Sequence, residues 1–208
     1  MHTGLGFLKI PEWIVKFAYL NLLWFCFSLL GGIVLGVFPA TTAMFAVVRQ
    51  WLLGETEIPV FKRFWKFYKQ DFLRSSLLGY VLFAVGFTLY VDFMLLDQSE
   101  NSFRWLHFLL LILSSIYVLT LLYAFPVFVH YQMKVFQVLK TAFLVMVISP
   151  LSTIMMIAGT LIIYIVILYS PSFLPIFSAS LLSFLIMWAA VLSFQKIDKK
   201  NKVTKQAS

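Results

Sequence analysis

Long apolar segments constrain the fold of this chain more than any other feature. Five of them exceed 20 residues, and a helix of about that length crosses the roughly 30 Å hydrocarbon core of a bilayer. A sixth apolar segment, 39–53, is shorter, and as a helix it would reach only about 22 Å at 1.5 Å per residue. The predicted long spans are residues 11–35, 75–96, 105–131, 141–169 and 173–194.

The overall composition supports a membrane protein. Of the 208 residues, 62% are hydrophobic and only 12% are charged, whereas soluble domains carry about 25% charged residues. We therefore expect an all-α, polytopic membrane helix bundle of about six membrane helices in a single domain, residues 1–195. The net charge of +8 fits anionic lipid headgroups and the bias of cations toward the cytoplasmic side, so we do not expect a nucleic-acid partner.

The distribution of lysine and arginine predicts the topology. Two cations, Lys9 and Lys16, lie at the N-terminal end of the first span, six lie from Arg49 to Arg74, two separate the fourth and fifth spans, and five follow the last span. If segment 39–53 crosses, 15 cations are cytoplasmic and only Arg104 is outside. If it does not cross, the N-terminus moves outside and the division is 13 to 3. The positive-inside rule favours six crossings, with both termini cytoplasmic.

Segment 59–71 predicts a basic amphipathic helix. Its apolar residues recur every three to four positions, and Lys62, Lys66 and Lys69 share another face. This pattern is typical of a helix lying in the interface plane on anionic lipid, and it would also suit a partner subunit. The candidate lipid-binding or docking residues are Lys62, Arg63, Trp65, Lys66 and Lys69.

Polar side chains inside membrane helices are functional candidates because burying them in lipid is unfavourable. We select Asn21, Thr41, Thr42 and Asp92. Asp92 is near the outer end of its span, where it could sit at headgroup level or couple transport to a cation. The other three would be neighbours if the first two helices form a hairpin, either as interhelical hydrogen bonds or as a substrate site.

No residue pattern indicates catalysis or a cofactor. Cys26 is the only cysteine, and His107 and His130 lie near opposite ends of one predicted helix, so they cannot share a metal ion. No catalytic pairing or phosphate-binding glycine loop is present in a suitable context. We therefore expect no enzymatic activity, no cofactor and no metal.

Prolines and charges shape the C-terminal half. The span 141–169 is predicted to continue past Pro150, with Ser149 and Ser152 as partners for the backbone carbonyl that the proline frees. Residues 134–140 form a second, weaker basic amphipathic segment. The basic tail, 196–208, is predicted to be a disordered cytoplasmic extension.

Several segments resemble the YesL family of bacterial integral membrane proteins, most strongly between residues 16 and 95. The resemblance is carried by AYLNLLW (18–24), GVFPATTA (36–43), FAVVR (45–49), residues 61–65 and 68–73, Gly79 and YVD (90–92). It implies a bacterial plasma membrane location and an unknown molecular activity, in a family whose genes often lie beside those for carbohydrate uptake. An accessory or scaffold component associated with sugar-transporter subunits is the first hypothesis. A small permease or channel is the alternative, and it would need a polar cavity reaching the middle of the bilayer.

Overall fold

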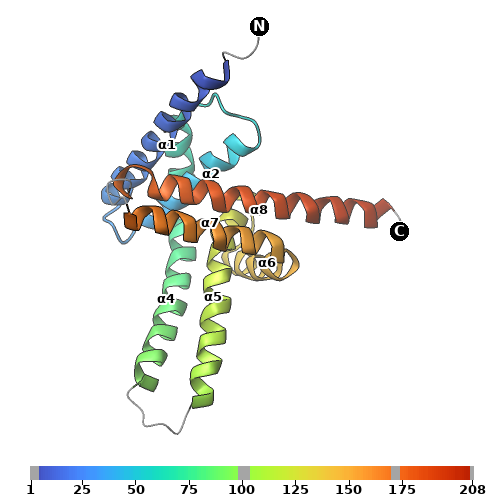
Figure 1. Ribbon diagram of the computed structural model, residues 1–208. Helices are drawn as coiled ribbons and strands as arrows, with labels where there is room; N and C mark the ends of the chain where they lie inside the picture. Colours follow the sequence, from blue (N-terminus) through green and yellow to red (C-terminus); the bar gives the residue numbers. More distant parts are fainter. Residues whose placement is uncertain (1–4, 98–103, 170–173, 207–208) are drawn as a thin grey trace.

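The computed structural model describes residues 5–97, 104–169 and 174–206, and all regular secondary structure in these ranges is α-helical (Figure 1). Five of the helices are long and apolar enough to cross a membrane. The expected all-α membrane-spanning architecture is therefore confirmed. The helices are α1 (Leu5–Leu30), α2 (Val37–Leu52), α3 (Val60–Gln70), α4 (Phe72–Asp97), α5 (Arg104–His130), α6 (Val135–Ile148), α7 (Pro150–Tyr169) and α8 (Leu174–Gln206).

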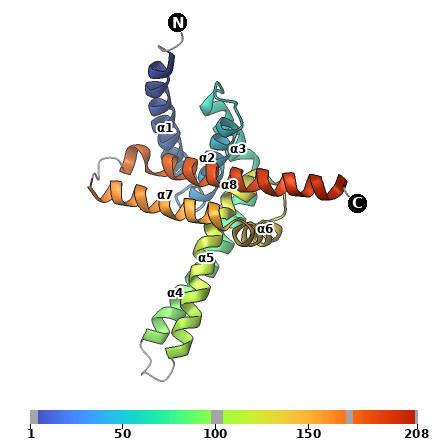
Figure 2. The same ribbon diagram turned by 45° about the vertical axis from the view of Figure 1, so that its right-hand side comes forward.

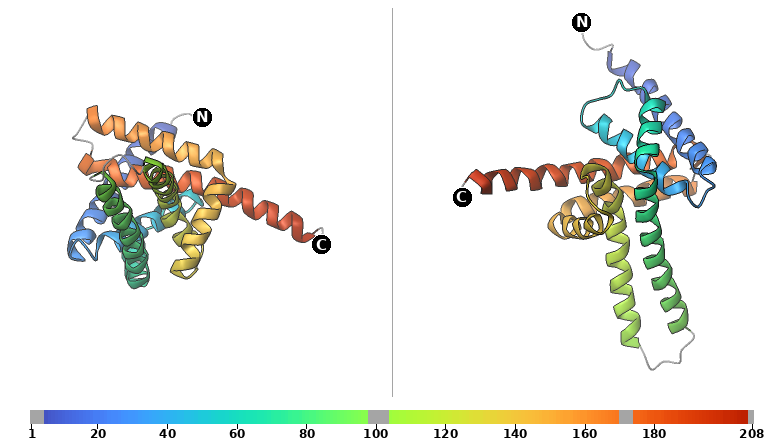
Figure 3. Two further views of the ribbon diagram at one scale, coloured as in Figure 1. Left: turned by 90° about the horizontal axis from the view of Figure 1, so that it is seen from below. Right: turned by 180° about the vertical axis from the view of Figure 1, so that it is seen from behind.

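The helices run in several directions. The α4–α5 hairpin extends away from the other helices, and the α7–α8 hairpin crosses it near its inner end (Figures 1 and 2). Only Asp71 separates α3 from α4, and the right-hand view of Figure 3 shows α3 leading into α4. Residues 98–103, between α4 and α5, and residues 170–173, between α7 and α8, lie outside the described ranges.

Helix α2 is the centre of the fold. It packs against α1, α3, α4, α5 and α8, and most of its residues are buried, from Pro39 to Trp51. Because protein rather than lipid covers this helix, the hydrocarbon thickness does not fix its length. Helix α2 begins at Val37, two residues before the predicted start, and its first turn accommodates Pro39 because the N–H groups there have no helical partner.

Helix α1 differs from its predicted bounds at both ends. It begins before Pro11 and ends at Leu30 rather than at residue 35. A turn follows in which Gly32 and Ile33 have positive φ values of 75° and 56°. A Cβ atom on Gly36 would collide with the carbonyl oxygen of Ser28, so the chain can reverse this tightly only with glycine at position 36. The glycines therefore end the helix earlier than its apolar character suggests.

The predicted continuous helix 141–169 is two helices. Pro150 starts α7, and Ser149 has a non-helical backbone (φ −122°, ψ 62°). The Met146 carbonyl lacks an N–H partner at Pro150. The Thr153 hydroxyl lies within hydrogen-bond distance of this carbonyl (3.4 Å) and of the Ser149 carbonyl (3.2 Å), so Thr153 is the side chain beside the freed carbonyl, where Ser149 and Ser152 were predicted. The basic segment 134–140 is the start of α6 rather than a separate element.

The predicted disordered tail is also corrected, because α8 continues as a helix to Gln206. The segment from 195 to 206 is rich in lysine and glutamine, which are good helix formers, and it contains no glycine or proline. The polar segment after residue 195 can therefore be helical, because it extends a helix that has already formed and needs no new nucleation.

Candidate functional site

Helix α3 forms where the sequence predicts the basic amphipathic helix. It starts directly after Pro59, whose extended backbone (φ −69°, ψ 98°) suits the residue that precedes a helix. Phe64 and Tyr68 are buried on one face, and the three lysines are exposed on the other. The residue spacing therefore separates an aromatic face from a cationic face, defined here by Lys62, Lys66 and Lys69.

The aromatic face of α3 packs on the end of α1. The Phe27 ring contacts four aromatic rings of α3 at centroid distances of 5.1–6.2 Å: those of Phe61, Phe64, Trp65 and Tyr68. The Tyr68 hydroxyl donates a hydrogen bond to the Phe27 carbonyl at 3.2 Å. Burial raises the pKa of Tyr68, which keeps this donor protonated. The apolar face that an interfacial helix would turn toward lipid is thus largely covered by protein.

The cationic face is open. Lys69 Nζ lies 4.2 Å from the centroid of the Trp65 ring, a cation–π geometry that holds the ring beside the charge. Next to it, Pro59, Lys62, Arg63, Trp65 and Lys66 line a surface hollow of about 520 Å³. In the part of the chain that the structure describes, no ion pair joins the α3 cations to an acid. All five predicted docking residues therefore share one surface with an uncompensated positive charge.

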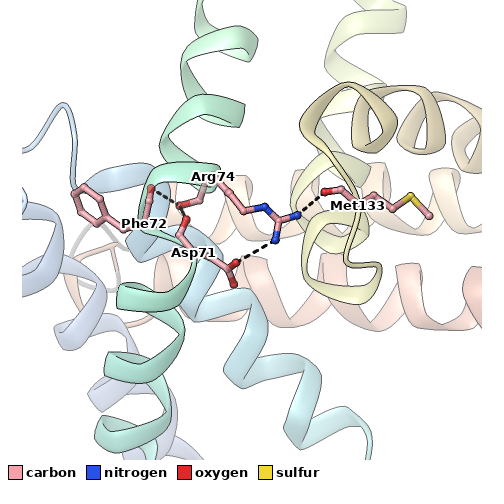
Figure 4. A network of polar contacts seen from close by, with 5 residues as sticks. Asp71, Phe72, Arg74 and Met133 are labelled. Atoms are coloured by element: carbon pink, nitrogen blue, oxygen red, sulfur yellow. Dashed lines mark hydrogen bonds and ion pairs between the residues drawn. The ribbon is translucent and has the colours of Figure 1, made fainter.

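Polar contacts tie both ends of α3 to the rest of the protein. Before the helix, Lys16 Nζ of α1 donates to Glu57 Oε1 at 3.2 Å and to the Thr56 carbonyl at 3.1 Å. After it, Arg74 donates to the Met133 carbonyl at 2.6 Å and lies 3.7 Å from the carboxylate of Asp71 (Figure 4). Burial raises the pKa of Asp71, and the Arg74 charge partly offsets this.

Sequence reasoning counted Arg74 only as part of the positive charge. Its guanidinium also lies 5.6 Å from the Phe128 ring of α5, so Arg74 joins the α3–α4 junction to the connection between α5 and α6. Asp71, three residues earlier, is the local signal that could have suggested a structural role for Arg74, because residues at this spacing are neighbours on a helix.

A close helix contact accounts for part of the sequence resemblance. The Phe38 ring lies directly against the backbone of Gly79, and a Cβ atom at that position would overlap the ring. The Tyr80 hydroxyl donates to the Val34 carbonyl at 3.3 Å beside this contact. The GVFP segment therefore packs against Gly79 where α2 meets α4. Because α4 follows α3 after one residue, this contact also helps to position α3.

The four polar candidates within membrane helices do not form one site. The Trp24 indole donates to Thr41 Oγ1 at 3.0 Å, and the Thr41 and Thr42 hydroxyls donate to the carbonyls of Val37 and Phe38. Asn21 is buried in α1. Asp92 is half-buried near the C-terminal end of α4, and Figure 1 shows that this end of the helix extends away from α2. Thr41 thus links α1 to α2, as interhelical hydrogen bonding requires, whereas Asp92 stands apart.

One further polar pair was not anticipated. Arg49 Nε of α2 donates to His130 Nδ1 of α5 at 3.2 Å, and the His130 ring packs 4.5 Å from the ring of Phe194 in α8. This contact joins three helices at one point. His107 instead packs against Phe93, and among the described residues no group of three His, Cys, Asp or Glu side chains is placed to hold a metal ion.

The fold and site define an α-helical, membrane-spanning protein with a buried central helix and an exposed basic helix. A family model described as "Protein of unknown function, DUF624" matches residues 17–93, from within α1 to α4. Over 192 residues the chain is 40% identical to the uncharacterized protein YteU of Bacillus subtilis (strain 168), covering 92% of this chain and 86% of the relative.

The uncharacterized proteins YesL and YesV of the same organism are 34% and 33% identical to the chain. The matches cover 94% and 91% of this chain, respectively, and 92% of each relative. The chain therefore belongs to the YesL family, whose members named here have no assigned activity. No solved structure matches the chain.

Proposed function

We propose that this protein is a non-enzymatic accessory or scaffold component of the bacterial plasma membrane that docks an acidic protein partner on the cationic face of α3. The partner in this proposal is a subunit of a carbohydrate-uptake system, as the family resemblance implies. The proposal rests on one observation: α3 buries its aromatic face against Phe27 of α1 and leaves its lysines exposed and without an acidic partner within the described chain.

The chemistry of the face suits an acidic protein surface. Complementary charge accelerates association and fixes the orientation of a complex, and both effects weaken as salt increases. Trp65 adds an aromatic side chain to the lining of the basic hollow, and tryptophan and arginine are among the side chains that most often dominate binding energy at interfaces. By the positive-inside rule this face is cytoplasmic, where the energising subunits of a transporter would be reached.

The permease alternative has less support. A transport path needs polar groups that converge on a cavity, but Asp92 is separate from Thr41 and Thr42, and both threonine hydroxyls donate to carbonyls of their own helix. The cavity beside Thr41 is lined almost entirely by apolar side chains. An accessory role therefore fits the arrangement better than a path for a sugar or an ion.

The test is co-purification from native membranes in mild detergent, followed by quantitative mass spectrometry. A variant with Lys62→Glu, Lys66→Glu and Lys69→Glu reverses the face, and Lys134→Glu, Lys140→Glu and Lys196→Glu make the same charge change at exposed lysines elsewhere. We expect wild type and the control to recover a transporter component, and the α3 variant to lose it at least tenfold.

Equal recovery by all three proteins, or none with wild type, would contradict the proposal. Binding that instead follows the anionic lipid content of reconstituted vesicles, with no protein recovered, would assign the face to lipid headgroups, the other partner predicted from the sequence.

A further inference from the structure

A second feature lies among α1, α2, α5 and α8, away from the cationic face of α3. It is a groove of about 270 Å³. Residues from α1, α5 and α8 that line it fall within the candidate membrane spans Pro11–Leu30, Trp105–His130 and Phe177–Lys199. Most of the groove is thus built from helices that are long and apolar enough to cross a membrane, and α2 supplies the rest. Its main lining residues are Trp24, Thr41, Phe45, Phe125, Leu182 and Ile186.

The polar groups at this groove are already engaged. Trp24 Nε1 donates to Thr41 Oγ1 at 3.0 Å, and the Thr41 hydroxyl donates to the Val37 carbonyl at 2.7 Å. Ser183, on the α8 side, donates to the Ser180 carbonyl at 2.8 Å. Each of these donors is therefore satisfied within the protein, and no lining residue is charged. A sugar or ion in the groove would lose its hydration without gaining free donors or a compensating charge in return.

The rest of the wall is apolar. The rings of Phe45 and Phe125 stack with centroids 5.9 Å apart and planes 9° apart, and the α8 side presents Leu182 and Ile186. An apolar hollow of this kind gains dispersion contacts when atoms fill it. A volume of about 270 Å³ suits a segment of a hydrocarbon chain rather than an entire lipid.

We propose that this groove binds one acyl chain of a membrane lipid, held between α2, α5 and α8. The occupant follows from three observations: most of the lining comes from candidate membrane spans, the donors are internally satisfied, and the volume suits a chain segment. A bound chain would complete the packing around the central helix α2. The inference is independent of the docking proposal, because it concerns other residues and requires no protein partner.

Lipid retention after purification in mild detergent tests the inference. Ala179 lines the groove from α8, whereas Ala158 is exposed on α7, so Ala179→Phe fills the groove and Ala158→Phe makes the same change on an exposed surface. Native mass spectrometry should show one retained phospholipid per chain for wild type and Ala158→Phe, and at least fivefold lower occupancy for Ala179→Phe. Wild-type occupancy in Ala179→Phe, or no retained lipid in wild type, would overturn the inference.

A second measurement uses the wild-type protein and so does not depend on a variant that folds. Vesicles containing phosphatidylglycerol with a photoreactive diazirine on the acyl chain are irradiated, and the labelled residues are mapped. Met44 and Phe45 are only 1% and 6% exposed, so bulk lipid reaches them only through the groove that they line. Label on either residue is expected, and label confined to exposed residues such as those of α7 would refute chain binding.

Discussion

Phe27→Ala removes the side chain on which α3 is seated. Phe27 is 6% exposed and contacts four aromatic rings of α3. Truncating a buried phenylalanine to alanine typically lowers the free energy of unfolding by about 3–5 kcal/mol, because apolar contacts are lost and a cavity remains. For a chain of this size each kcal/mol corresponds to about 2–4 °C in Tm. At 3 kcal/mol, the expected decrease in Tm is therefore about 6–12 °C.

The matched control is Phe25→Ala, two residues earlier on α1. Phe25 is 56% exposed, so its truncation removes few contacts with protein, and a change of about 0.5 kcal/mol or less is expected. Both variants are compared with wild type by thermal unfolding in the same detergent. Partial trypsin digestion at the lysines of α3 provides a local reading, because detachment of the helix exposes its backbone to the protease.

The Phe27→Ala variant should have a lower Tm than wild type and should be cleaved faster within α3, whereas Phe25→Ala should behave as wild type in both assays. Equal effects of the two substitutions would show that Phe27 does not seat α3. Unchanged cleavage of α3 in Phe27→Ala would also refute this packing, since the helix would then be held by other contacts.

Substitutions at two further places test the contacts that support α3. Gly79→Ala places a methyl group into the Phe38 ring and should lower the free energy of unfolding by about 1–3 kcal/mol. Adding Phe38→Leu should restore part of the lost free energy. Thermal unfolding of the single and double variants measures the loss and the recovery. Arg74→Gln should weaken the tie to Met133 and lower Tm more than Asp71→Asn does. Burial raises the pKa of Asp71, so the native protein binds that proton more tightly than the unfolded chain. Wild type should therefore gain stability relative to Asp71→Asn as the pH falls from neutral toward 4, and a shift in the opposite direction would contradict this assignment.

The sequence predicted the existence of α3 but not the surface that covers its aromatic face. Spacing alone groups Phe64 and Tyr68 on one side of the helix, and lipid or protein could satisfy that pattern equally well. The partner, Phe27, is distant in the sequence and lies within a uniformly apolar helix. Its contact with α3 depends on the tight turn at Gly36, which only the three-dimensional structure reveals.

Helix boundaries were predicted less well than the helices themselves. Pro150 was expected to lie within a continuous helix, but the non-helical backbone at Ser149 divides that segment into α6 and α7. Apolar composition hides such a break because both resulting helices remain apolar. Similarly, the pattern assigned the tail after residue 195 to disorder from its charge, although its residue types can extend α8 once the helix has formed.

The polar contacts between distant segments were the least predictable part of the site. Arg74 and Arg49 appeared only as positive charges, yet they join the Met133 carbonyl and His130 across helices. No periodicity marks such pairs. For Thr41, the sequence suggested interhelical hydrogen bonding if the first two helices form a hairpin, and in the structure the Trp24 indole of α1 donates to Thr41 Oγ1.

Cysteine accessibility in oriented membranes measures the exposure of α3 and the side on which it lies. In a Cys26→Ser background, Lys66→Cys and Phe64→Cys place thiols on the exposed and buried faces of the same helix. A membrane-impermeant maleimide should label Lys66→Cys in inside-out vesicles but not in spheroplasts, and Phe64→Cys should react in neither until the protein is denatured. Labelling of Lys66→Cys from the outside, or equal protection of both positions in both preparations, would contradict a cytoplasmic cationic face.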